Sequence, residues 1–154
     1  MATGSPDTTS CCSPRALFGW SPPALVADTP LKRAVDRLLP RTGVSLLIFF
    51  GAVVGLLLIG PFFSKPIELV ADGVAALLAG TWCALNFWRS RHAHCVVTAV
   101  GWLGLAPFTF VEATIGRSLI GGNEQLVFLA VLFAGLGFEA AWYVRLRTNA
   151  VQPR

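Results

Sequence analysis

The sequence predicts an all-α membrane protein with four transmembrane helices. Hydrophobic residues make up 55% of its 154 residues and charged residues only 13%, which is about half the charged share of a soluble domain. Because lipid cannot bond backbone N–H and C=O groups, a membrane-crossing stretch must close its own hydrogen bonds as a helix of roughly 20 apolar residues. We therefore predict a membrane domain over residues 41–145, with spans at about 43–63, 69–88, 95–114 and 124–144.

The two ends of the chain are predicted to be cytoplasmic tails, at residues 1–28 and 146–154. The first is rich in Ser, Thr, Pro and Gly without a hydrophobic period, which is typical of a disordered segment. Its adjacent Cys11 and Cys12 are expected to be reduced thiols in the cytoplasm. Reversible modification or capture of a metal ion is the alternative for this pair.

Residues 29–40 are predicted to form a short amphipathic helix on the membrane surface. Thr29 suits the N-cap, Pro30 suits the first helical position, and Pro40 ends the helix. We expect its apolar face to lie at the headgroup level of the inner leaflet, with its basic side chains near anionic lipid. Docking to a partner protein is the alternative. The residues that share the apolar face are Leu31, Ala34, Val35, Leu38 and Leu39.

The basic residues predict the topology of the chain. With a cytoplasmic N-terminus, ten of the twelve basic side chains fall on the cytoplasmic side and only Lys65 and Arg117 fall outside. The positive-inside rule predicts this distribution for a protein whose two termini are both cytoplasmic. Topology thus accounts for the net charge of +4, and nucleic-acid binding is not expected. Ten Arg against two Lys, with abundant Ala and Gly, suggest a GC-rich bacterium and hence the bacterial inner membrane.

Small residues at helical spacing predict close packing between helices. The first span contains two glycines in the G-x-x-x-G spacing that lets two helix backbones approach. The second span carries small residues on two adjacent rows, which predicts that it lies at the centre of the bundle. The predicted helix-packing residues are Gly51, Gly55, Ala71, Ala75, Ala79 and Gly80.

A Pro-Phe pair occurs twice, in "LLLIGPFF" at residues 56–63 and in "LGLAPFTF" at residues 103–110. Each pair is followed by a short polar stretch and a second apolar run that ends in an aromatic residue and an arginine. This pattern predicts a duplicated two-helix hairpin, with both hairpins in the same orientation in the membrane. Pro61 and Pro107 are expected to loosen the last turn of their helices. Paired kinks that form a gate or a substrate cradle are the alternative.

The segment "GWLGLAPFTF" resembles the signature of bacterial SPW-repeat proteins in its Trp, Leu and Pro-aromatic order. The segment "GLLLIGPFF" resembles it less closely, since Gly-Pro-Phe and Ala-Pro-Phe stand where that family has Ser-Pro-Trp. The resemblance covers about residues 47–145. It implies a small integral membrane protein built of two-helix repeats, without catalytic residues.

Three ionisable residues lie inside the predicted spans rather than at their first residue, namely Asp72, Glu112 and Glu139. Asp72 and Glu112 are expected near the outer surface, together with Lys65 and Arg117, and Glu139 near the cytoplasmic surface. Charged groups inside a membrane are costly and are usually paired or functional. These carboxylates are therefore expected either to pair near an interface and hold the helices in register, or to line a path for an ion or a proton.

The loop "RSRHAHC" places His92, His94 and Cys95 within four residues. Imidazole and thiolate are ligands for zinc and copper, but adjacent side chains do not all converge on one ion. The loop is therefore expected to face water and lipid phosphate, without metal or other cofactor. A redox pair of Cys83 and Cys95 is not expected, because the sequence places them at different depths.

The sequence contains no nucleophile turn and no phosphate-binding loop, so we do not expect an enzyme. The favoured function is a structural or accessory role, in which the protein associates in the bilayer with itself or with another membrane protein. The alternative is a small oligomeric transporter or channel that uses Asp72, Glu112 and Glu139. A membrane enzyme is the third possibility.

Overall fold

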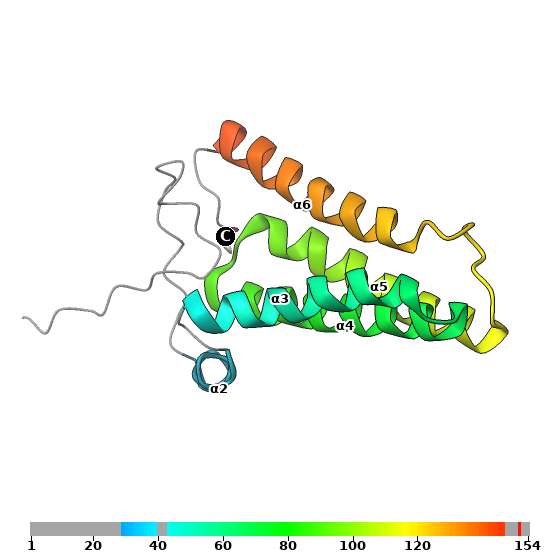
Figure 1. The fold of residues 1–154 in the computed structure, drawn as a ribbon. Helices are drawn as coiled ribbons and strands as arrows, with labels where there is room; N and C mark the ends of the chain where they lie inside the picture. Colours follow the sequence, from blue (N-terminus) through cyan, green and yellow to red (C-terminus); the bar gives the residue numbers. More distant parts are fainter. Residues whose placement is uncertain (1–28, 40–42, 147–150, 152–154) are drawn as a thin grey trace, which may run out of the picture.

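The computed structural model describes residues 29–39, 43–146 and 151, and its elements are all helical (Figure 1). The all-α prediction is thereby confirmed for this part of the chain. The predicted tail at 1–28, and most of the predicted tail at 146–154, lie outside the described residues. In chain order the elements are α2 (Pro30–Leu38), α3 (Gly43–Ile59), the 3-10 helix η1 (Gly60–Phe62), α4 (Lys65–Ser90), α5 (Ala93–Ile115) and α6 (Glu124–Leu146).

Three of the described helices are long and apolar enough to cross a membrane, over Lys65–Arg89, Ala93–Ile115 and Glu124–Leu146. They correspond to the second, third and fourth predicted spans, and each is a few residues longer than predicted. The first predicted span is divided between α3 and η1. The apolar helix there, Leu47–Phe62, is shorter than the other three.

Pro61 accounts for the end of α3. Proline has no backbone N–H, so the carbonyl four residues earlier, that of Leu57, loses its partner within the helix. The side-chain amide of Gln125, at the start of α6, donates to this carbonyl at 2.6 Å. The chain tightens into η1 after Ile59, and α4 begins at Lys65. The freed carbonyl thus ties α3 to α6.

Pro107 occupies a different setting from Pro61. It lies inside α5, and the helix continues past it to Ile115. The two Pro-Phe pairs are alike in sequence, but one stands in a 3-10 turn after a helix and the other stands within a helix. The proposed duplication of a two-helix hairpin stays a prediction.

The helix α4 lies in the middle of the described bundle and packs against α2, α3, α5 and α6. Figure 1 shows α3 and α5 running alongside α4. The face of α4 toward α5 is made of small side chains, and Ala75, Ala76 and Ala79 are buried there. A Cβ atom on Gly80 would lie only 3.0 Å from the backbone nitrogen of Leu103. Small residues therefore let the backbones of α4 and α5 approach closely.

The helix α6 lies at the edge of the bundle. Only 17% of its apolar 18-residue stretch is buried inside the described bundle, against 50% for the matching stretch of α4 and 44% for that of α5. Its main attachment is to α5, where Trp102 Nε1 donates to the carbonyl of Phe128 at 3.0 Å and the two rings stack with centroids 4.7 Å apart. The remaining apolar surface of α6 is left for lipid or for another chain.

The helix α2 packs across one end of the bundle, where it is seen end-on in Figure 1. The Thr29 hydroxyl accepts a hydrogen bond from the backbone N–H of Lys32 at 3.2 Å, as an N-cap does. Val35 and Leu39 are buried against Trp82 of α4. Part of this apolar face therefore contacts the bundle, whereas Leu31 and Ala34 on the same face are exposed. The location of α2 on a membrane surface stays a prediction.

Candidate functional site

Buried ionisable side chains gather at the two ends of the bundle. At the end where α4 connects to α5, the histidine cluster consists of His92, His94 and Glu139. At the end where α5 connects to α6, the carboxylate cluster consists of Lys65, Glu68, Asp72 and Glu124. Exposed fractions are 2% or less for His92, Glu139, Asp72 and Glu124. Such burial is costly inside a membrane unless the groups are paired or functional.

The turn between α4 and α5 positions the histidine cluster. Arg91 ends α4 with φ 55°, a left-handed conformation that is uncommon outside glycine. Its guanidinium lies over the rings of Phe87, at 5.1 Å, and Trp88, at 5.4 Å, and such cation–π contacts are favourable. The next residue, His92, is the extended N-cap of α5. The backbone N–H of Val151 also donates to the Arg91 carbonyl, at 2.8 Å.

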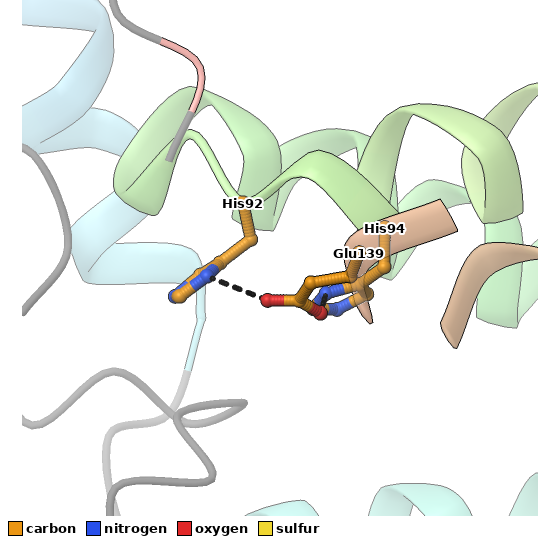
Figure 2. A group of neighbouring side chains, drawn as sticks. All are labelled: His92, His94 and Glu139. Atoms are coloured by element: carbon orange, nitrogen blue, oxygen red, sulfur yellow. Dashed lines mark hydrogen bonds and ion pairs between the residues drawn. The ribbon is translucent and has the colours of Figure 1, made fainter. Parts of the chain in front are cut away.

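Within the cluster, one carboxylate from α6 faces two imidazoles from the start of α5. Figure 2 shows Glu139 between the rings of His92 and His94. Its Oε1 lies 3.4 Å from Nδ1 of His92, and its Oε2 is in direct contact with Nδ1 of His94. The two imidazoles are tilted by 30°, with centroids 5.6 Å apart. Both rings therefore present the same kind of nitrogen to one carboxylate.

A second set of polar side chains surrounds the cluster. The Sγ atom of Cys95 lies 3.3 Å from Nε2 of His94. Asn86 Nδ2 lies 3.5 Å from the same sulfur and donates to it, and Arg89 Nη2 donates to Asn86 Oδ1 at 3.1 Å. Cys83, a buried free thiol, also contacts Cys95. The two thiols are thus in contact, whereas the sequence had predicted them at different depths in the membrane.

The expectation that the loop around His92 and His94 faces water and phosphate is wrong. The helix α5 begins at Ala93, so His94 and Cys95 lie in its first turn and pack inside the bundle. His92 is 0% exposed, and His94 is 8% exposed. The partner that sequence reasoning missed is Glu139, which was expected at the same end of the membrane but was not connected with the histidines.

This arrangement is chemically able to hold a cation. His Nδ1 and carboxylate oxygen are ligands for transition-metal ions, and the ligand atoms of the three residues lie within 4.8 Å of one another. The expectation that no metal binds here considered only residues that are neighbours in the sequence. The fold brings the carboxylate of Glu139, from α6, beside His92 and His94.

The carboxylate cluster has the opposite charge pattern. Lys65 Nζ lies 3.0 Å from Glu68 Oε1 and 3.8 Å from Glu124 Oε2. Asp72 lies among these groups and near the Gln125 amide, although its oxygens accept no hydrogen bond of normal geometry from the described residues. A single ammonium thus faces three carboxylates.

The predicted grouping of Asp72, Glu112, Lys65 and Arg117 is only partly reproduced. Lys65 and Asp72 come together, but with Glu124 and Glu68, which sequence reasoning missed. Glu112 is fully buried and accepts a hydrogen bond from the backbone N–H of Leu119. This bond holds the connection between α5 and α6, so Glu112 has a local structural contact there. Arg117 is exposed.

The predicted helix-packing residues fall into two groups. Ala75, Ala79 and Gly80 of α4 are buried, and Ala71 is half-buried with its Cβ near Gly60. For Gly51 and Gly55 of α3, nothing in the described chain lies within 4 Å of an added Cβ. Their predicted role in helix packing therefore concerns a second chain, and it stays a prediction.

Comparisons with known proteins identify one transporter relative. No family model matches the chain, and no solved structure matches it. The nitrite transporter NirC of Salmonella typhimurium is 26% identical over 142 residues, which covers 89% of this chain and 51% of that protein. The chain thus spans about half the length of this relative. The similarity and the long apolar helices place the protein in a membrane, whereas the resemblance to SPW-repeat proteins stays a prediction.

Proposed function

We propose that the protein is a small membrane transporter or channel that works as a homo-oligomer. The observation that carries this proposal is the similarity to the nitrite transporter NirC along 89% of the chain. That name describes transport rather than catalysis, in line with the expectation that the chain is not an enzyme. It also supplies the first solute to test, nitrite.

The proposal includes four membrane crossings, with α3 and η1 together forming the first. At 1.5 Å per residue, the 17 residues of α3 extend about 26 Å. The three residues of η1 add about 6 Å at the wider rise of a 3-10 helix. The sum is close to the roughly 30 Å of hydrocarbon in a bilayer. Both termini then lie on one side, which the excess of basic residues assigns to the bacterial cytoplasm.

The two polar clusters are suited to be the mouths of a transport route. They lie at opposite ends of the bundle, and the core between them is apolar, with Ala76, Ala79 and Trp102 among its members. Four closely packed helices leave little room for a solute within one copy. We therefore place the route between copies that meet through the exposed faces of α3 and α6, with the buried clusters bordering its two ends from within each copy.

A structural or accessory role is the second candidate, and the open face of α3 supports it. Gly51 is exposed, Gly55 is half-buried, and both have open space at the Cβ position. Such a face accepts a closely packed helix. The same face serves an oligomeric transporter, so the measured flux has to decide between the two functions.

The deciding experiment is nitrite entry into proteoliposomes that contain the purified protein. We expect nitrite flux above that of empty vesicles. We also expect a reduced flux for Glu139→Gln, because this change breaks the contacts of Glu139 with His92 and His94 and loosens the packing of α6 on α5 at one end of the route. Thr114→Ala is the control, since Thr114 is exposed on α5 and lies outside both clusters and outside the exposed faces of α3 and α6. Sizing of each reconstituted variant in mild detergent shows whether its oligomer is intact.

A monodisperse oligomer that passes neither nitrite nor chloride would contradict the transport proposal and support the accessory role. A co-purified membrane protein in constant ratio would support that role further.

A further inference from the structure

We propose that His92, His94 and Glu139 form a binding site for one divalent transition-metal ion of the zinc class. Nothing in the comparisons assigns a metal to this chain, and this site goes beyond the proposed transport function. The three residues are buried, with exposed fractions of 0% for His92, 8% for His94 and 2% for Glu139. Their ligand atoms come from two helices and lie within 4.8 Å of one another.

One of the two distances around Glu139 matches that between two ligands of a shared ion, and the other needs a small adjustment. Zinc binds His nitrogen and carboxylate oxygen at about 2.0–2.2 Å in a tetrahedron, so two ligand atoms of one ion lie roughly 3.3 Å apart. The Nδ1 atom of His92 and Oε1 of Glu139 are 3.4 Å apart. His94 Nδ1 and Glu139 Oε2 lie closer to each other than two ligand atoms of one ion would lie. A small rotation of either side chain would therefore have to separate them when an ion binds.

The groups behind the ligands also fit a metal site. Histidines that ligate a metal usually hydrogen-bond through their other ring nitrogen, which fixes the orientation of the ring. The Nε2 atom of His94 lies 3.3 Å from Cys95 Sγ, and Asn86 Nδ2 lies 3.5 Å from the same sulfur. The imidazole of His94 is therefore oriented with Nδ1 toward Glu139.

The packing of α6 on α5 brings the third ligand into place. Gly135 lies one helical turn before Glu139, and a Cβ at this position would lie 2.5 Å from Cγ2 of Thr98 and 3.4 Å from the carbonyl oxygen of His94. Only glycine allows α6 to come this near to the first turns of α5. The carboxylate is thus held over the histidines by backbone contact.

The ligand set favours zinc over magnesium or calcium. Two imidazoles and one carboxylate suit a borderline ion, whereas magnesium and calcium prefer oxygen ligands. Three protein ligands leave a fourth position open, as in zinc sites that bind water or a solute. The ion would connect α5 to α6 at the end of the bundle where α4 turns into α5.

The test measures zinc bound to the purified full chain. The protein carries Cys11→Ser and Cys12→Ser, which remove the two N-terminal thiols as competing ligands, and it has no histidine tag. After treatment with a chelator and incubation with Zn²⁺ alone, we expect one zinc per chain to remain after desalting. His92→Ala, His94→Ala and Glu139→Gln should each lower the affinity by at least about 10-fold, since even outer-shell changes typically cost that much. Glu124→Gln, a buried carboxylate at the other end of the bundle, should leave the affinity unchanged.

Cobalt substitution provides a readout that does not depend on the folding of the variants. Co²⁺ bound to the unaltered cluster should show the intense visible bands of a tetrahedral site and no thiolate charge-transfer band. Zinc absent from the parent protein, zinc retained by all three variants, or a thiolate band would overturn the proposal. Because these measurements do not depend on any flux, their failure is distinct from failure of the transport proposal.

Discussion

The two buried clusters handle charge in opposite ways. In the histidine cluster, one carboxylate faces two imidazoles, and all three residues are buried. In the carboxylate cluster, one ammonium faces three carboxylates, and the Lys65 side chain is 33% exposed. A fully buried pair is costly to break, because the remaining partner keeps its desolvation cost. A partly exposed pair contributes little, because water and salt screen it.

The largest expected effect is that of Glu139→Gln. In chelator-treated protein, it should lower the free energy of unfolding by about 3 kcal/mol, because two buried imidazoles lose their carboxylate. The measurement is SDS-driven unfolding in mixed micelles, with Glu68→Gln at the other cluster as the matched control. The side chain of Glu68 is 17% exposed, and its loss should cost clearly less. Equal losses for the two variants would show that the clusters do not differ in this way.

Gly135→Ala should have the next largest effect. The added Cβ would meet Cγ2 of Thr98, whose hydroxyl donates to the His94 carbonyl at 2.9 Å. Overpacking of this kind costs about 1–3 kcal/mol. Gly137→Ala, on the same helix with open space around it, should be neutral or stabilising because alanine favours a helix. Thermal unfolding followed by sizing in detergent compares the two, and a loss for Gly137→Ala alone would contradict the packing described here.

Gln125→Leu tests the carboxylate end of the bundle. The change removes the hydrogen bond from Gln125 Nε2 to the Leu57 carbonyl, which Pro61 leaves without a helical partner. The loss should be about 1 kcal/mol. Asn123→Ala is the control, because it removes a bond of similar length, from Asn123 Nδ2 to the Ile120 carbonyl, at an exposed site. Unfolding in mixed micelles should show a smaller loss for Asn123→Ala, and the reverse order would contradict the role of Gln125 in joining α6 to α3.

The smallest expected effect is that of Lys65→Met. The 3.0 Å pair of Lys65 with Glu68 is partly exposed at both side chains, and the 3.8 Å approach to Glu124 is longer than a hydrogen bond, so the change should cost less than about 1 kcal/mol. The difference from the unaltered protein should shrink further as salt is added, since salt screens the ion pairs. Unfolding in mixed micelles at low and high ionic strength measures this. A loss as large as that of Glu139→Gln, and insensitive to salt, would show that the two ends are energetically alike.

Much of the fold follows from local patterns. The apolar stretches of α4, α5 and α6 were visible as runs of sufficient length, and the N-cap at Thr29 was visible from its residue type. The end of α3 was less predictable. Pro61 marked it, but the same Pro-Phe pair at Pro107 lies inside a continuing helix. A proline removes one hydrogen bond in either place, and tertiary contacts decide whether the helix goes on.

The candidate site was predictable in its residues and not in its assembly. Glu139 and Asp72 stood out because charged side chains are rare in apolar stretches. His92 and His94 stood out because they lie close together in a loop, although no metal was expected there. Their partners are set by which helix faces meet. Glu124 was overlooked because it stands at the boundary of an apolar run, where a carboxylate usually faces water.

The sequence by itself determined the class of this protein, the positions of its long helices and three of its buried carboxylates, Asp72, Glu112 and Glu139. These depend on local composition, since apolar length and the need to satisfy backbone hydrogen bonds act within a single segment. The tertiary structure alone decided that Glu139 faces His92 and His94, and that Lys65 lies near Glu124. Contacts between helices depend on their rotation and depth relative to one another, which small residues such as Gly135 set through close packing.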